Sequence, residues 1–575
     1  MEHTVNEDAL SLAEFVALPT TIDFNIINSD RFKVYAAARP YLRVGTELAN
    51  GYVPVYTNQA YVETVFRELG SDFIGFYPRI LSPLDDKSNF DSGITQVLNQ
   101  PYLDLSGKGV VIGIIDTGID YRNPAFRTSD GKSRILRLWD QTVEGPRPDY
   151  LYYGSAYTNE DIDRALASPD PYAVVPSRDT DGHGTFLASV AASSEENQYI
   201  GAAPGASLMV VKLRRAHPYY IEKLLLPPDN PNLYEATDYL LGIKYILDRT
   251  EELNVPVVIL ISMGSNLSGH DGTTLFEEYI SFVSQRPGYV FVTAAGNESN
   301  LKHHTQGRVA PTGATDTINL RVGEHDASFT VIMFANAYDK LSVNLISPTG
   351  EVVPRLPFRA GTSYEEKLIL EKTLITIEYY RDVNTIIFLK FRNTTRGIWE
   401  IKLFGDAIVN GDYYAWLPVE GQVSPDIEFL RPVPENTIVS PATSNRSITT
   451  GAYNSADGSL FVSSSWGPTR LPSMSPDLVA PGVNVKGIYP TGTGTMSGTS
   501  VAASIVAGAC ALLLEWGVVN GNEPAMDGNY VRTLLIAGAD REEGIVYPNV
   551  KWGYGKLDLF GAFTTLKESN INYQP

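Results

Sequence analysis

Four short apolar runs alternate with segments of helical periodicity through the middle of the chain. These runs occupy residues 109–115, 206–213, 256–261 and 289–292. Strands that are apolar throughout, rather than at every second position, are typical of a parallel sheet whose two faces are both covered by helices. The pattern therefore predicts an α/β fold with a parallel sheet sandwiched by helices.

A longer apolar segment, residues 501–516, is rich in Ala, Val and Leu. Its length favours a buried helix over a strand. The single cysteine, Cys510, lies in this segment, so the chain forms no internal disulfide and the residue is expected to be an ordinary core cysteine. No stretch reaches the ~20 apolar residues of a membrane span, so none is expected.

A different pattern, short strand-like runs without helical segments, fills residues 316–433. The runs lie at 328–333, 341–346, 374–379, 385–390 and 397–403. Short strands separated by turns are typical of an antiparallel sandwich or jelly roll. We therefore expect an inserted all-β jelly-roll domain that divides the α/β domain into residues 91–315 and 434–575.

The first 90 residues precede the α/β pattern and have a pattern of their own. Residues 51–56 and 72–77 are strand-like, and between them Val62, Val65, Phe66 and Leu69 recur at helical spacing. Residues 81–92 carry Ser, Pro, Asp and Lys with few apolar side chains, as a linker does. The sequence predicts a small α+β unit at 1–90, joined to the rest by this linker.

Charge and composition narrow the class of protein. The chain has 575 residues and a formal net charge of −21, which disfavours nucleic acid and anionic membranes as partners. Its acidic N-terminus lacks the basic region and apolar core of a signal peptide. Together with the absence of disulfides, this favours an intracellular compartment.

Three polar residues in small-residue turns carry the candidate chemistry. Asp116 follows an apolar run, His183 lies in Asp-Gly-His-Gly-Thr, and Ser500 precedes the alanine-rich helix. A serine hydroxyl needs a neighbouring base to become a nucleophile, and His183 has a suitable pKa. Asp116 would fix the histidine tautomer and stabilise the imidazolium. Taken alone, each of these residues more often has only a structural role, in a turn or as a helix cap. Three such coincidences would be needed to explain all three residues in this way.

These motifs, in the order Asp…His…Ser, resemble the subtilase family. A fourth match, Ala294-Ala295-Gly296-Asn297, lies where that family has its oxyanion asparagine. The resemblance implies a serine endopeptidase in which Asn297 and the backbone N–H of Ser500 stabilise the oxyanion. It also implies that an extended protein substrate pairs with the chain at Ser262, Met263, Gly264, Ala294, Ala295 and Gly296.

The long N-terminal unit and the insertion resemble the clostridial Csp-type germination subtilases. Local matches are found at 119–121, 124–126 and 135–141. The resemblance implies that residues 1–90 are a propeptide, which the enzyme cuts between residues 81 and 100 and retains in its cleft. An activated member of that group processes a cortex-hydrolase precursor. Some members lack triad residues and are regulators, whereas this chain has all three.

Metal binding has little support in the sequence. His303-His304 has no partner residues at a ligand spacing, and we expect it to lie in a surface loop. Many subtilases bind calcium, but no run here has a ligand spacing that identifies a site. No metal or cofactor is therefore predicted.

Three functions are compatible with the sequence. The first is a self-maturing endopeptidase, intracellular or spore-associated, that processes a germination hydrolase precursor. The second is a regulatory or sensing protein of subtilase fold whose cleft stays occupied by its propeptide. The third is a general intracellular turnover protease. The residues give no preference for the side chain next to the scissile bond.

Overall fold

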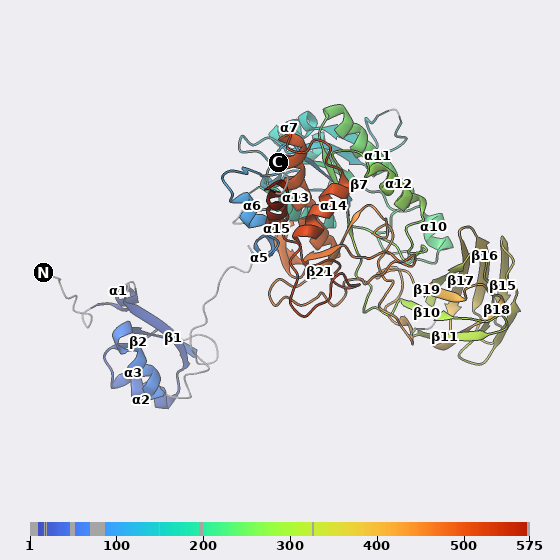
Figure 1. Cartoon of the computed structure of the whole chain (residues 1–575). Coiled ribbons are helices and arrows are strands. Elements are labelled where there is room, and N and C mark those ends of the chain that lie inside the picture. Colours follow the sequence, from blue (N-terminus) through green and yellow to red (C-terminus); the bar gives the residue numbers. More distant parts are fainter. Residues whose placement is uncertain are drawn as a thin grey trace. The chain divides into compact units, whose positions relative to one another are not determined.

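The computed structural model describes residues 10–16, 18, 20–45, 52–69, 87–148, 150–194, 199–324 and 327–571. The chain forms two compact units, Met1–Leu84 and Asp85–Pro575 (Figure 1).

The N-terminal unit is a small α+β fold. Its antiparallel sheet has the order β1-β3-β2, and helices accompany the strands. Phe24, Phe32, Val55 and Val65 are buried in its core. The expected strand at 51–56 corresponds to β3 and the expected helix to α3. The strand expected at 72–77 and residues 81–86 of the expected linker lie outside the described residues. The elements are α1 (Leu12–Val16), β1 (Thr21–Ile27), α2 (Asp30–Ala37), β2 (Leu42–Val44), β3 (Tyr52–Asn58) and α3 (Gln59–Leu69).

The larger unit is built on an eight-stranded sheet of order β22-β21-β9-β8-β4-β7-β5-β6. All neighbouring strands are parallel except β5 and β6. The four predicted apolar runs form the central strands β4, β7, β8 and β9. The strands are β4 (Val111–Asp116), β5 (Ile135–Asp140), β6 (Ser155–Thr158), β7 (Ser207–Lys212), β8 (Val257–Ile261), β9 (Tyr289–Ala294), β21 (Ile448–Tyr453) and β22 (Leu478–Pro481).

Helices cover both faces of this sheet, which explains why its strands are apolar throughout. Ile112 and Ile114 of β4 pack in the core that contains α9 and α13. Val111 and Ile115 pack in the core that contains α11. The helices are α5 (Lys87–Asp91), α6 (Ile94–Leu98), η3 (Pro124–Phe126), α7 (Asn159–Ala167), α8 (Pro171–Val174), α9 (His183–Ala192), α10 (Pro218–Lys223), α11 (Ala236–Leu253), α12 (Leu275–Val283), α13 (Thr499–Leu514), η4 (Glu515–Val519), α14 (Gly528–Gly538) and α15 (Leu559–Ile571).

Helix α13 lies in the centre of the larger unit. Among the described residues, Thr499–Val519 is long and apolar enough to cross a membrane, but 89% of its apolar window is buried inside the protein. This corrects the expectation that no segment reaches that length. A buried core helix has the same length and composition, so the segment is weak evidence for a membrane span. Cys510 is fully buried in this helix, as predicted.

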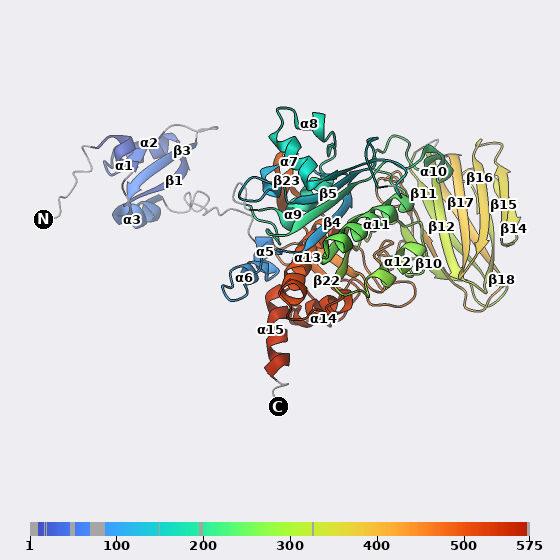
Figure 2. The same ribbon diagram turned by 90° about the horizontal axis from the view of Figure 1, so that it is seen from above.

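The insertion forms two antiparallel sheets that face each other (Figure 2). One sheet has the order β10-β19-β12-β17-β16-β15 and the other β14-β13-β18-β11-β20. Their facing sides share one core, which includes Phe329, Phe391 and Trp399. The strands are β10 (His304–Arg308), β11 (Thr315–Val322), β12 (Ala327–Asn336), β13 (Lys340–Ile346), β14 (Val352–Leu356), β15 (Thr362–Lys367), β16 (Leu374–Arg381), β17 (Asn384–Thr394), β18 (Gly397–Ala407), β19 (Asp412–Trp416) and β20 (Ile427–Phe429). A short hairpin, β23 (Val485–Tyr489) with β24 (Gly492–Met496), precedes α13.

The histidine pair that we expected in a surface loop is buried instead. His303 and His304 are 5% and 1% exposed. His304 begins β10, pairs with Trp416 of β19 and stacks on its ring at 4.8 Å. His303 Nδ1 lies 2.7 Å from the carboxylate of Glu298. Strand pairing across more than 100 residues buries a dipeptide that looks polar in isolation.

Candidate active site

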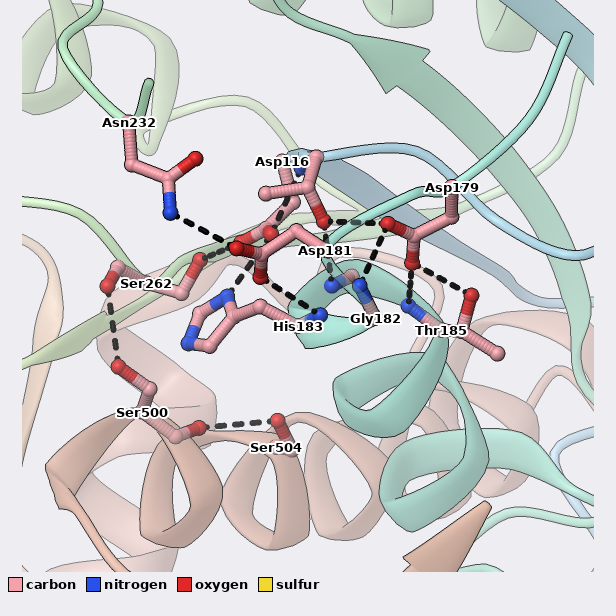
Figure 3. A network of polar contacts seen from close by, with 12 residues as sticks. Asp116, Asp179, Asp181, Gly182, His183, Thr185, Asn232, Ser262, Ser500 and Ser504 are labelled. Atoms are coloured by element: carbon pink, nitrogen blue, oxygen red, sulfur yellow. Dashed lines mark hydrogen bonds and ion pairs between the residues drawn. The ribbon is translucent and has the colours of Figure 1, made fainter. Parts of the chain in front are cut away.

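Asp116 and His183 come together where β4 and α9 meet. Asp116 is the last residue of β4 and is fully buried, and His183 is the first residue of α9. His183 Nδ1 lies 2.8 Å from Asp116 Oδ1 (Figure 3). The second carboxylate oxygen accepts a hydrogen bond from Ser262 Oγ at 2.6 Å. The carboxylate therefore holds Nδ1 of the imidazole and leaves Nε2 for other partners.

Two glycines permit this close approach of α9 to β4. Gly182, the residue before the helix, has φ = 96°, which a side chain would strain. A Cβ on Gly184 would lie 2.3 Å from the carbonyl oxygen of Gly118, well inside van der Waals contact. The Gly-His-Gly sequence is thus required by backbone geometry as well as by chemistry.

Ser500 is the second residue of α13 and is half-buried. Its hydroxyl donates to the carbonyl oxygen of Ser262 at 3.0 Å. Within the described residues, no hydrogen bond joins Ser500 to His183. Proton transfer to His183 Nε2 requires the hydroxyl to leave the Ser262 carbonyl, and such bonds are often completed only when substrate is present.

Asn297 and the start of α13 form the candidate oxyanion hole. Asn297 Oδ1 accepts hydrogen bonds from Thr499 N at 3.1 Å and Thr499 Oγ1 at 3.2 Å, so its amide Nδ2 is left as a donor. The N–H of Ser500 lies in the first turn of the helix and has no partner within it. A Cβ placed on Gly498 would lie 3.5 Å from Asn297 Nδ2 and 4.0 Å from Ser500 N. Asn297 Nδ2 and Ser500 N therefore both border the space that is open because Gly498 has no side chain.

The environment pulls the pKa values of Asp116 and His183 apart. Burial would raise the pKa of Asp116, but the charge of His183 and hydrogen bonds from His183, Ser262 and Thr117 outweigh it and lower the pKa. Burial would lower the pKa of His183, but the charge and hydrogen bond of Asp116 outweigh it and raise the pKa. The carboxylate thus stabilises a protonated His183, as a general base requires.

Asp179 organises the turn that presents His183, and our sequence analysis missed it. It is 6% exposed and accepts hydrogen bonds from Thr117 Oγ1, Gly182 N, Thr185 N and Thr185 Oγ1 (Figure 3). Thr117 Oγ1 in turn accepts from Gly184 N. The only signal in the sequence was an aspartate two residues before Asp-Gly-His.

Two cavities adjoin these residues. The larger, about 820 Å³, is lined by His183, residues of the 230–237 segment and Ser262–Ser265. The smaller, about 180 Å³, is lined by Ser500 and Asn297. Of the predicted substrate-binding residues, Ser262, Met263 and Gly264 line both cavities, and Ala294 and Gly296 line the smaller one.

Ala295 is the one predicted substrate-binding residue that lines neither cavity. It is fully buried and packs with Ile438 and Ala442. Its N–H donates to Thr450 O and its carbonyl accepts from Val439 N. With Thr450 of β21 on one side and Val439 on the other, both backbone hydrogen-bonding groups of Ala295 are used within the protein.

The described residues hold no group of three or more His, Cys, Asp or Glu side chains arranged to bind a metal ion. The polar groups near His183 are instead satisfied by protein partners. The arrangement thus provides a nucleophile, a base with its orienting carboxylate, and two oxyanion donors. These are the catalytic groups of a serine peptidase.

The comparison with known families agrees with this class. The sequence profile of the subtilase family matches residues 107–349 and 431–555. The chain belongs to the subtilase family, whose members are subtilisin-like serine peptidases. The gap between the matched segments falls within the β-sandwich insertion.

One solved structure is similar over nearly its whole length. The Clostridium perfringens CspB protease has 31% sequence identity, covers 85% of this chain and 99% of its own, and gives a TM-score of 0.74. Two Bacillus subtilis proteins are similar in sequence. Serine protease AprX is 30% identical over 24% of this chain, and the major intracellular serine protease is 25% identical over 44%. These two alignments span 32% and 62% of the relatives' own lengths.

Proposed function

We propose that the protein is a serine endopeptidase in which Ser500 attacks the peptide carbonyl and His183 Nε2 takes its proton. The observation that carries the proposal is the 2.8 Å contact of His183 Nδ1 with the buried Asp116, beside the cavities that Ser500 and His183 line. Asn297 Nδ2 and Ser500 N stabilise the oxyanion. His183 then protonates the leaving amine, and water releases the acyl group by the same steps in reverse.

The finer proposal is that the enzyme cuts off its own N-terminal unit and then processes a hydrolase precursor during spore germination. Two observations support it. The N-terminal unit is a separate compact body, and the chain is similar to the CspB protease along most of its length. Retention of the cleaved unit in the cleft is part of this proposal.

Self-cleavage is tested by intact mass analysis of purified protein. Wild type should separate into a fragment of roughly the first 80–100 residues and a large body, whereas Ser500→Ala should stay whole. Ser504→Ala is a matched control, since this nearby hydroxyl donates only to the Ser500 carbonyl and its loss should leave cleavage intact. Wild type that stays whole while binding an active-site serine probe would favour an externally activated enzyme. A whole protein that binds no probe would favour the regulatory alternative.

A further inference from the structure

The smaller cavity beside Ser500 is built by two distant parts of the chain. The α/β part supplies Ser262–Gly264, Gly296 and Asn297, and the loop between β19 and β20 of the inserted sandwich supplies Val419 and Glu420. This loop, residues 417–426, also lines the larger cavity through Val419, Glu420 and Gln422. The insertion is therefore part of the substrate-binding surface.

Hydrogen bonds to the α/β part hold this loop in place at three points. Asn266 Nδ2 donates to Leu417 O at 3.1 Å. The N–H of Glu420 donates to Glu298 Oε1 at 2.9 Å. Asn230 Nδ2 donates to Gly421 O at 2.9 Å. A wall fixed at three successive points can discriminate between side chains by shape and charge.

Glu298, the residue after the oxyanion asparagine, places a carboxylate beside the same cavity. Its side chain is 3% exposed. Oε2 accepts a hydrogen bond from Asn266 Nδ2 at 3.1 Å and lies 2.7 Å from His303 Nδ1. Among the described residues, Oε1 accepts only from Glu420 N. A carboxylate has about four acceptor sites, so one remains on Oε1 for a further donor.

Glu420 adds a second carboxylate, and it is exposed. The structure gives its carboxylate no cationic partner among the described residues. Asp181 and Glu235 line the larger cavity, and no lysine or arginine lines either cavity. His183 is the only residue lining the two cavities that can carry a positive charge. The field in the cleft therefore favours hydrogen-bond donors and cations.

The remaining walls of the smaller cavity are small or aliphatic: Met263, Gly264, Ala294, Val419 and Val439. Such walls suit a long aliphatic stem. We propose, on the basis of the proposed function, that this cavity selects a substrate side chain with an N–H donor at its end (lysine, arginine or glutamine) in the residue whose carbonyl Ser500 attacks. An acidic end is repelled, and a purely aliphatic one leaves the buried Glu298 carboxylate without a further donor.

The test uses enzyme from which the cleaved N-terminal unit has been removed, and peptides that differ only in this residue. The peptides form two matched pairs: lysine against norleucine, which lacks only the terminal amine, and glutamine against glutamate. We expect kcat/KM to favour lysine and glutamine by about tenfold or more within each pair. Rising salt should shrink the lysine preference, since Glu420 is exposed.

Glu420→Gln should reduce the lysine-to-norleucine ratio by about three- to fivefold, the scale of an exposed ion pair. Glu365→Gln, an exposed glutamate on β15, is the matched control and should leave the ratio unchanged. An unchanged ratio in Glu420→Gln would overturn the role of this loop.

Norleucine or phenylalanine peptides cleaved as fast as lysine and glutamine peptides would overturn the inference and leave the proposed function standing. Failure of mature wild type both to cleave any peptide and to bind a fluorophosphonate probe at Ser500 would instead overturn the proposed function itself.

Discussion

Ser262 contacts both ends of the proposed catalytic system: its carbonyl oxygen accepts the hydrogen bond from Ser500 Oγ at 3.0 Å. Its own hydroxyl donates to Asp116 Oδ2 at 2.6 Å. The residue also lines both cavities. Reaction at Ser500 therefore requires the hydroxyl to exchange the Ser262 carbonyl for His183 Nε2, at the position where substrate binds.

The first prediction concerns pH. His183 must be neutral to accept the Ser500 proton, so kcat/KM should rise with pH through the pKa of His183 in the free enzyme. The Asp116 carboxylate raises that pKa, so the midpoint should lie above the ordinary value of about 6.5. A pH profile of peptide hydrolysis measures it, and a rate that is flat from pH 5 to 8 would contradict the role of His183.

Removal of the side-chain oxyanion donor should reduce turnover. We expect Asn297→Ala to lower kcat by about 10²–10³-fold, the scale found for this donor in subtilisin, with a small change in KM. Thr499→Val is the control, because it removes the hydroxyl that donates to Asn297 and keeps the donor amide. Equal losses in the two variants would mean that Asn297 acts by anchoring α13.

Asp179→Ala should destabilise the His183 turn. The substitution leaves the buried N–H groups of Gly182 and Thr185 without their acceptor, so the free energy of unfolding should fall by about 3 kcal/mol. Turnover should fall as well. Urea unfolding measures the effect, and Asp130→Ala, at an exposed position, should change stability by less than about 0.5 kcal/mol. Equal stability of the two variants would show that the Asp179 network is dispensable.

Two buried histidines, His270 and His304, should make stability sensitive to acid. Burial lowers the pKa of His270 to about 4 and that of His304 to about 3. Between those values and about 6.5, the unfolded chain binds more protons than the folded one. Stability should therefore fall as pH decreases from 6.5 toward 4, by about 1.4 kcal/mol per pH unit for each histidine.

His304→Phe keeps an aromatic ring beside Trp416 and removes one titrating group, so it should flatten this dependence by about one proton. Unfolding midpoints in urea at pH 7 and pH 5 give the slope. His217→Asn is the control, since His217 is exposed and its loss should leave the slope as in wild type. A wild-type slope in His304→Phe would assign the acid sensitivity to other groups.

The sequence predicted the parts of the site that short motifs encode. Asp116, His183, Ser500 and Asn297 each lie in a turn whose small residues are required locally, and the structure brings all four together. The contributions of Asp179, of the Ser262 hydroxyl and of the loop at Val419 depend on contacts between segments 62 to 191 residues apart. No local pattern reports such contacts.

The burial of two sites was not expected from the sequence, and in both cases for the same reason. His303 and His304 look like surface residues until β10 pairs with β19 and buries them. Ala295 shares a motif with residues that line the cavity, but it packs against Ile438 and Ala442 from a distant segment of the chain. In both cases, burial depends on which distant segment of the chain packs alongside, and the local sequence pattern does not reveal that. The fold class was predictable because it depends on the spacing of apolar runs along the chain.

The most direct test of the central claim is peptide mapping of mature protein after reaction with a fluorophosphonate, which modifies activated serine hydroxyls. We predict one adduct per chain, on Ser500. Ser500→Ala and His183→Ala, which should not cleave themselves, are first freed of the N-terminal unit with a second protease; the adduct should then be absent in Ser500→Ala and form at least about 100-fold more slowly in His183→Ala. A folded, mature wild-type protein that forms no adduct, or forms it on another serine, would contradict the assignment of Ser500 as the nucleophile.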